Sequence, residues 1–229
     1  MKKLILSAVI LVFSTISANA VDLTFLSLTA GVAANQSVFG ASAKEQKFND
    51  DQTTIKTQNT KEGVFTSDYS SQFLEVGLGS WVSLGYEMTP DNISTPTNIT
   101  NEGGNNEATV SVDFNDMETT YIKLNSPWGL YFKAGSVQVD LDIKETVASG
   151  NTYKNTSTEG TMYGAGYQKY IGETGFGFRV EGAYMDLDDV KTDNAQATVG
   201  SNNRLNRVSA SNLEGLTAKV ALTYTLGRN

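Results

Sequence analysis

Apolar and polar side chains alternate along most of the chain after residue 20. The C-terminal segment shows the pattern best, and similar alternation begins at Phe176 and at Trp81. Alternation with a period of two is typical of strands that have two unlike faces. The apolar face of the last segment carries Leu216, Ala218, Val220, Leu222, Tyr224 and Leu226. No later segment has the run of about 18 apolar residues that a membrane-spanning helix needs.

The alternation predicts eight strands joined by connections of two kinds. Short Gly-, Asn-, Ser- or Pro-containing turns precede strands that open on Trp81, Trp128 and Phe176, at nearly equal spacing, which indicates four hairpins. Long polar stretches at 48–62, 91–106, 147–158 and 191–213 predict loops at the opposite end. The expected strands are 24–46, 63–76, 81–90, 107–124, 128–146, 159–170, 176–190 and 214–226.

The phase of the alternation is uncertain in three of these strands. Asn35 and Gln36 interrupt the first strand, so that either a bulge or a separate N-terminal segment over 23–36 would fit. In the fifth strand the apolar residues move from even to odd numbers, which predicts a bulge near Gly135 and Ser136. In the fourth strand the outward face of 116–124 stays open.

The first 20 residues have the three parts of an export signal. Two lysines follow Met1, residues 4–13 form an apolar stretch, and 18–20 read Ala-Asn-Ala, a cleavage site. An apolar stretch this short cannot span a bilayer as a helix, which needs about 20 residues. We therefore expect a signal peptide over 1–20 and one barrel domain over 21–229.

Three features favour a barrel with its apolar face outward, toward lipid. The polar face carries charges of both signs, whereas a small-ligand cavity would be mostly apolar. Aromatic side chains gather near the short turns, and the turns are short at one end only, as in outer-membrane barrels. The expected lumen charges are Glu75, Lys133, Arg179, Glu181 and Lys219, and the expected interface aromatics are Trp81, Trp128, Tyr170, Phe176 and Tyr224. The prediction is an all-β, eight-stranded antiparallel up-and-down transmembrane β-barrel.

Eight strands enclose an interior just wide enough for side chains. Arg179 and Glu181 are successive inward positions, and we expect them to pair with Glu75, Lys133 or Lys219, because desolvated charges need partners. Such a network would close the lumen, which favours a structural barrel that displays four polar external loops. The alternatives are a narrow, porin-like channel for ions or very small solutes, and a soluble lipocalin-like binding barrel with its apolar face inward.

Composition narrows the possible chemistry. The chain has no His and no Cys, which excludes Ser-His and Cys-His catalysis, His- or Cys-ligated metals and disulfides. Its net charge of −8 argues against nucleic-acid binding. Asp186, Asp188 and Asp189 lie close together in the sequence, as catalytic acids or calcium ligands can, but solvated rim acids are the simpler interpretation. We expect no enzymatic activity, no catalytic or metal-binding residues and no cofactor.

The sequences GAGYQKY at 164–170 and FRVEGAY at 178–184, together with the signal and the hairpin rhythm, resemble the small OmpA-like and opacity-type outer-membrane barrels, often described as porin-family proteins. The resemblance implies the outer membrane of a Gram-negative cell, where lipid, lipopolysaccharide, the barrel-assembly machinery and an unknown external loop partner would be contacts. Enzymes among such barrels generally rely on a His, which this chain lacks. Chains of this kind usually end on an aromatic residue, a role that Tyr224 would take here.

Overall fold

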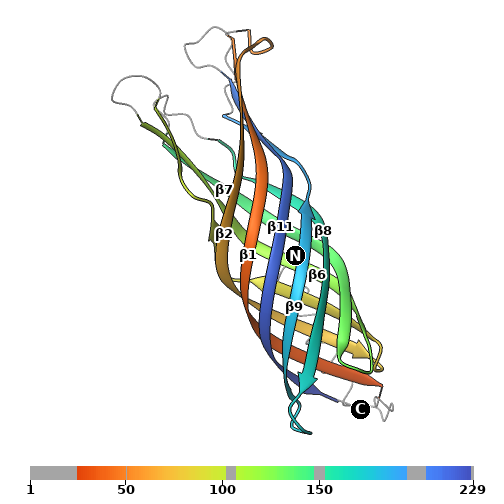
Figure 1. Ribbon diagram of the computed structural model, residues 1–229. Helices are drawn as coiled ribbons and strands as arrows, with labels where there is room; N and C mark the ends of the chain where they lie inside the picture. The colour runs from red at the N-terminus through yellow and green to blue at the C-terminus, as the bar shows by residue number, and fades with distance from the viewer. Residues whose placement is uncertain (1–24, 50, 102–106, 147–152, 195–204, 228–229) are drawn as a thin grey trace, which may run out of the picture.

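The computed structural model describes residues 25–49, 51–101, 107–146, 153–194 and 205–227. Within these residues the chain forms one antiparallel sheet, and eight long strands close it into a barrel (Figure 1). The closing pair joins the first and last strands of the wall, from Leu28↔Leu226 to Lys47↔Asn206. The wall strands are β1 (Leu26–Phe48), β2 (Ile55–Leu78), β3 (Val82–Thr89), β6 (Glu107–Asn125), β7 (Leu130–Thr146), β8 (Thr156–Tyr170), β9 (Phe176–Leu187) and β11 (Asn206–Leu226).

Three short strands lie beside the wall at the end opposite the short turns. β4 (Ile93–Ser94) and β5 (Asn98–Asn101) pair with β6, and β10 (Val190–Asp193) pairs with β11. In the part of the chain that is described, no helix has the length and apolar character to cross a membrane. The expected signal peptide at 1–20 lies outside the described residues.

The outer surface near the short turns is apolar. On β11 every second side chain points outward and is exposed, and Leu222 reaches 66 %. The outward apolar residues of this strand run from 216 to 226, about 33 Å along the strand at about 3.3 Å per residue. With a tilt of about 40° this length covers about 25 Å of barrel height, the height of a lipid-facing band. Because closure also pairs every wall strand on both sides at this level, the band is suited to hydrocarbon.

The polarity of the wall inverts further from the short turns. On β7, Val137 and Val139 are fully buried inside the barrel, while Gln138 and Asp140 are exposed outside. The predicted bulge near Gly135 and Ser136 is therefore wrong: β7 keeps one register with β8 from Leu130↔Tyr167 to Leu141↔Thr156. The apolar residues of β7 move from even-numbered, outward positions to odd-numbered, inward positions because the medium outside the strand changes from lipid to water.

The irregularity lies instead in β6. Its register against β7 shifts between Asn115 and Glu118, and Asp116 adopts a positive φ of 49°. Asp is one of the few residues that visit this left-handed region readily. Beyond the bulge, Tyr121 and Lys123 point into the barrel, which settles the face of this strand that the sequence left open.

β1 is continuous from Leu26 to Phe48, so neither a break at Asn35 and Gln36 nor a separate N-terminal segment occurs within its described residues. Asn35 points inward, and its amide donates a hydrogen bond to the Ser71 hydroxyl at 3.0 Å. The alternation of β1 looks interrupted here because the inward residue Asn35 and its outward neighbour Gln36 are both polar.

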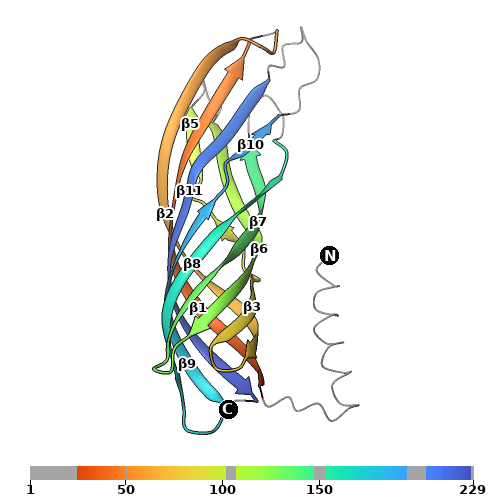
Figure 2. The ribbon, with the colours of Figure 1, turned by 90° about the vertical axis from the view of Figure 1, so that its right-hand side faces the viewer.

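The loops of the structure are shorter than the sequence predicts, because strands extend into the long polar stretches. β2 already begins at Ile55 and β11 at Asn206, and β1, β2 and β11 extend far beyond the short-turn half (Figure 2). Most residues of these extensions are polar, so the alternation in the sequence is weak there. From 55 to 64, every side chain of β2 is exposed.

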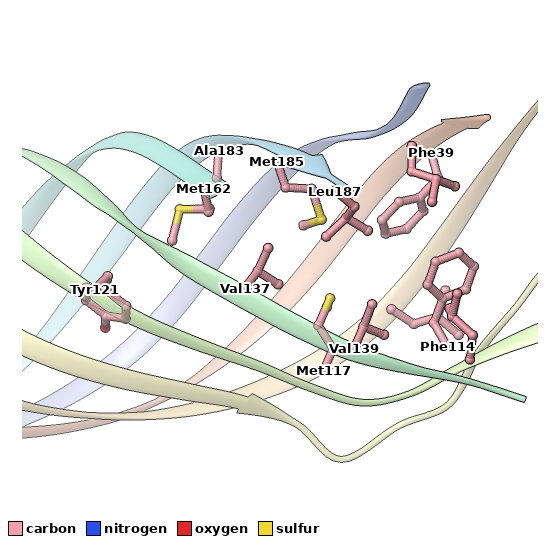
Figure 3. Packing of buried hydrophobic residues seen from close by; sticks show 13 residues of the cluster. Phe39, Phe114, Met117, Tyr121, Val137, Val139, Met162, Ala183, Met185 and Leu187 are labelled. Atoms are coloured by element: carbon pink, nitrogen blue, oxygen red, sulfur yellow. The ribbon is translucent and has the colours of Figure 1, made fainter. Parts of the chain in front are cut away.

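An apolar core fills the barrel in this distal half. Side chains from several wall strands meet inside it, among them Val137, Val139 and Met185 (Figure 3). The Phe39 ring stacks on those of Phe65 and Phe114, with centroids 5.2 and 5.9 Å apart. The barrel interior is therefore apolar in the half far from the short turns and charged in the half near them.

Candidate functional site: the charged lumen

The lumen at the level of the lipid-facing band contains charged side chains that the alternation of the strands directs inward. The wall strands β2, β3, β6, β7, β9 and β11 contribute them, and each is at most 8 % exposed. The set consists of the carboxylates Glu75, Glu87 and Glu181 and the cations Lys123, Lys133, Arg179 and Lys219. They form two groups that differ in their charge.

The first group, which we call the Glu75 cluster, lies nearer the short turns. The Arg179 guanidinium donates two hydrogen bonds to the Glu75 carboxylate, at 2.6 and 2.5 Å, and Lys123 donates another at 2.5 Å. Bidentate Arg–carboxylate pairing of this kind is geometrically specific and strong. The Tyr121 hydroxyl donates to the same carboxylate at 2.8 Å, and the Gln168 side-chain oxygen accepts from Arg179 Nε at 2.7 Å.

The second group, the Glu87–Glu181 cluster, balances two carboxylates with two lysines. Lys133 Nζ lies 2.7 Å from Glu181 and 3.3 Å from Glu87. Lys219 pairs with Glu87 and lies 3.4 Å from Glu181. The Tyr131 hydroxyl donates to Glu181 at 2.9 Å. Each lysine thus bridges both carboxylates, and this arrangement compensates all four charges.

Aromatic rings surround the two clusters. The Arg179 guanidinium lies 4.8 Å from the centre of the Phe73 ring, and Lys133 lies 4.6 Å from that of Tyr121. Such contacts between a cation and a ring face are attractive, the more so where water is excluded. Rings and ion pairs are therefore packed against one another in the lumen at this level.

Inward glycines make room for these rings. A Cβ at Gly85 would lie 2.3 Å from the Tyr121 ring. At Gly135 the neighbour is backbone, because a Cβ there would lie 2.1 Å from the Thr120 carbonyl oxygen. Gly182 faces outward, and an added Cβ meets nothing within 4 Å.

The structure places all five lumen residues named from the sequence inside the barrel. Arg179 pairs with Glu75, and Glu181 pairs with Lys133 and Lys219. Sequence reasoning missed four members of the two clusters besides their tyrosines. They are Glu87, Lys123, Gln168 and Ser71, whose hydroxyl donates to Glu87.

The aromatic residues named from the sequence lie at the short-turn end. Trp81 and Trp128 are 61 and 79 % exposed, and the Phe176 and Tyr224 rings pack with centroids 4.9 Å apart. Tyr170 is half-buried at the same end. Such a position suits amphipathic rings at a lipid–water boundary.

The acidic residues Asp186, Asp188 and Asp189 are exposed at the far end of β9. Among the described residues, no group of three or more Asp or Glu is arranged to hold a metal ion. Asp91, near the end of β3, accepts hydrogen bonds from the Ser70 amide and hydroxyl, which hold the pKa of its carboxyl below the usual range.

A closed eight-stranded wall, an apolar outer band and a charged interior define a β-barrel of the outer-membrane type. The structure is similar to that of the outer membrane protein OprG from Pseudomonas aeruginosa, with a TM-score of 0.54 and 11 % identity over 86 % of this chain and 96 % of that one. This likeness shows the fold.

Other solved outer-membrane barrels match less well. AlkL has a TM-score of 0.44 at 10 % identity and covers 86 % of this chain and 90 % of its own. Ail of Yersinia pestis has a TM-score of 0.39 at 10 % identity and covers 85 % of this chain and 99 % of its own. No protein-family model and no curated protein matches the sequence.

Proposed function

We propose that the protein is a structural barrel of the bacterial outer membrane, with a closed lumen and an external surface that contacts partners. The single observation that supports the proposal is the content of the barrel interior, where buried side chains lie at two levels. Paired charges and rings fill the lumen at the lipid-facing band, and the apolar core fills it beyond. A solute would have to break buried ion pairs and then cross a dry, packed layer, both of which are costly.

The location follows from the outer surface and the fold. The apolar band matches the thickness of hydrocarbon, and the wall leaves no unpaired sheet edge within it. The similarity to OprG adds a solved outer-membrane protein of the same architecture. Outer-membrane lipid and lipopolysaccharide would surround the band, and the barrel-assembly machinery would insert it.

The hairpin of β1 and β2 is the best candidate for an external contact surface. The pairing of β2 with β3 covers Gln72 to Leu78. Beyond it, within the described residues, β2 pairs in the wall only with β1. Asp51 holds the tip, where it accepts hydrogen bonds from the amides of Thr53 and Thr54 at 2.9 Å and from the Thr54 hydroxyl at 2.6 Å. A polar hairpin whose described tip residues are held by hydrogen bonds presents a defined shape to a partner.

We expect the barrel to act without catalysis, because the chain lacks the His and Cys on which most nucleophilic mechanisms depend. The soluble, lipocalin-like alternative needs an apolar interior and a polar exterior along the whole barrel. Only the half beyond the band has that arrangement, since Leu222 and Phe132 are 66 and 67 % exposed on the outer face nearer the short turns.

The channel alternative makes a different prediction for electrical recording. Refolded protein is added to planar bilayers, and folding is checked first by the shift in gel mobility between unheated and boiled samples. We expect a silent bilayer with the native chain and conductance with an Arg179→Ala, Tyr131→Ala double variant, which empties part of the lumen. Tyr163→Ala, on the outer face, is the matched control and stays silent.

Steady conductance of the folded native chain would refute the closed-lumen proposal and favour the channel. A soluble periplasmic protein without a heat shift would refute the outer-membrane location. Fractionation of cells that express the full chain tests this second point independently of the lumen.

A further inference from the structure

The Glu75 cluster has more positive than negative charge. One carboxylate, Glu75, faces two cations, Arg179 and Lys123, whereas the Glu87–Glu181 cluster pairs two carboxylates with two lysines. All of these groups are at most 8 % exposed. Buried charge is costly unless it is compensated, so the extra cation calls for an anion.

A cavity adjoins this cluster at the short-turn mouth of the barrel. Its volume is about 700 Å³, within the range of small-molecule sites. Lys123 and Gln168 line it together with Ser27, Thr29, Ser83 and Thr225. Among the described residues that line it there is no carboxylate. The mouth therefore offers a cation, hydroxyl groups and an amide, all of which are suited to an anion.

The Gln168 amide supplies a second, independent sign of a ligand. Its oxygen already accepts from Arg179 at 2.7 Å and from Lys123 at 3.5 Å. Its side-chain nitrogen has no hydrogen-bond partner, although the residue is only 9 % exposed. A buried donor without a partner destabilises a folded protein, and an unseen water or ion is one established explanation for such a group.

We propose that the short-turn mouth is a binding site for a small inorganic oxyanion of the phosphate class. Lys123 has three N–H donors, of which Glu75 and Gln168 occupy two, so one remains for the ligand. The Gln168 nitrogen donates the second hydrogen bond, and the hydroxyls of the rim complete the shell. The bound anion neutralises the Glu75 cluster from the side opposite the apolar core.

Inorganic phosphate is the probe, titrated against the full-length chain refolded in detergent micelles and followed by phosphorus NMR line width and by the midpoint of thermal unfolding. We expect saturable binding and a phosphate-dependent rise in the midpoint. Sulfate is expected to compete, and chloride at equal ionic strength is not. Equal competition by chloride would show only charge screening and would overturn the proposal.

Two substitutions and a matched control locate the site. Gln168→Glu supplies an internal carboxylate in place of the ligand, and Lys123→Gln removes the excess cation, so each is expected to weaken phosphate binding at least tenfold. Lys191→Gln removes an exposed lysine on β10, at the end of the barrel opposite the mouth, and is expected to change binding less than twofold. The heat shift on gels confirms that each variant is folded.

Absence of saturable binding to the folded native chain would overturn the proposal, as would native affinity in Gln168→Glu. A loss in Lys191→Gln as large as in the other variants would also overturn it, because binding would then follow net charge alone. Bilayer recording tests the closed lumen separately, so failure of one proposal is distinguishable from failure of the other.

Discussion

Replacing Glu87 by Gln tests whether the lumen is dry. The side chain is 8 % exposed and pairs with Lys219 and with Lys133, the latter at 3.3 Å. Gln keeps the shape and the hydrogen bond to Ser71 but removes the charge. Glu181 is then the only carboxylate beside the two lysines in the cluster.

The expected cost depends on the surrounding medium. Removing one partner of a buried ion pair destabilises proteins by about 3–5 kcal/mol, because an uncompensated charge stays buried. In a water-filled lumen the same change would cost less than about 1 kcal/mol, as for exposed pairs. Since the ionised groups of the cluster are all nearly inaccessible, we expect a loss of about 3–5 kcal/mol.

The double variant Glu87→Gln, Lys219→Met separates the charge effect from packing. It leaves one carboxylate and one lysine, and apolar replacement of buried charge is often neutral. We therefore expect most of the lost stability to return. Independent, additive effects of the two substitutions would contradict this coupling.

Reversible guanidinium unfolding of the barrel in lipid vesicles gives the free energies, with the fluorescence of Trp81 and Trp128 as the signal. Glu173→Gln, in the exposed turn between β8 and β9, removes the same charge and is expected to change stability by at most about 0.5 kcal/mol. If Glu87→Gln costs no more than this control, water reaches the cluster and the closed-lumen argument fails.

Four further predictions concern other parts of the barrel. Gly135→Ala is expected to destabilise by about 1–3 kcal/mol through overpacking against backbone, and Gly182→Ala by far less, in the same unfolding assay. Leu141→Ala, in the apolar core, is expected to cost about 2–5 kcal/mol, and no loss would mean that this half of the lumen is hydrated. Leu222→Arg, near the middle of the lipid-facing band, is expected to cost about 2–4 kcal/mol in vesicles, and a neutral result would place this face in water. Hydrogen bonds from Thr53 and Thr54 lower the pKa of the Asp51 carboxyl from 3.8 to about 2. The stabilisation of the hairpin tip by Asp51 is therefore complete above about pH 4 and is lost as the pH falls through about 2. Carboxyl NMR titration checks this prediction, and a midpoint near 3.8 would refute it.

The sequence predicts the wall of the barrel well where lipid lies outside and charge lies inside. Leu216 to Leu226 and Phe176 to Tyr184 keep a single alternation there. β9 begins at Phe176 and β11 ends at Leu226, as the sequence predicts. The prediction fails beyond the band, because alternation reports a difference between the two faces and not the direction of either. At Val137 the apolar residues change to the inner face, and a pattern read without the membrane boundary looks like a bulge.

The balance of positive and negative charge could have identified one lumen residue that the alternation alone did not. The five charges named from the sequence comprise two carboxylates and three cations, so a dry lumen required at least one more carboxylate. Glu87 stands on the polar face of the strand that opens at Trp81, opposite its apolar residues, and was available for that role. Lys123 was not accessible to the same argument, because the bulge at Asp116 sets the phase of its strand and depends on pairing with β7. With Lys123 included, the net charge of the lumen side chains is positive again. The negative charge that compensates it must come from outside this set of side chains. This is the physical reason to look for an anion at the short-turn mouth.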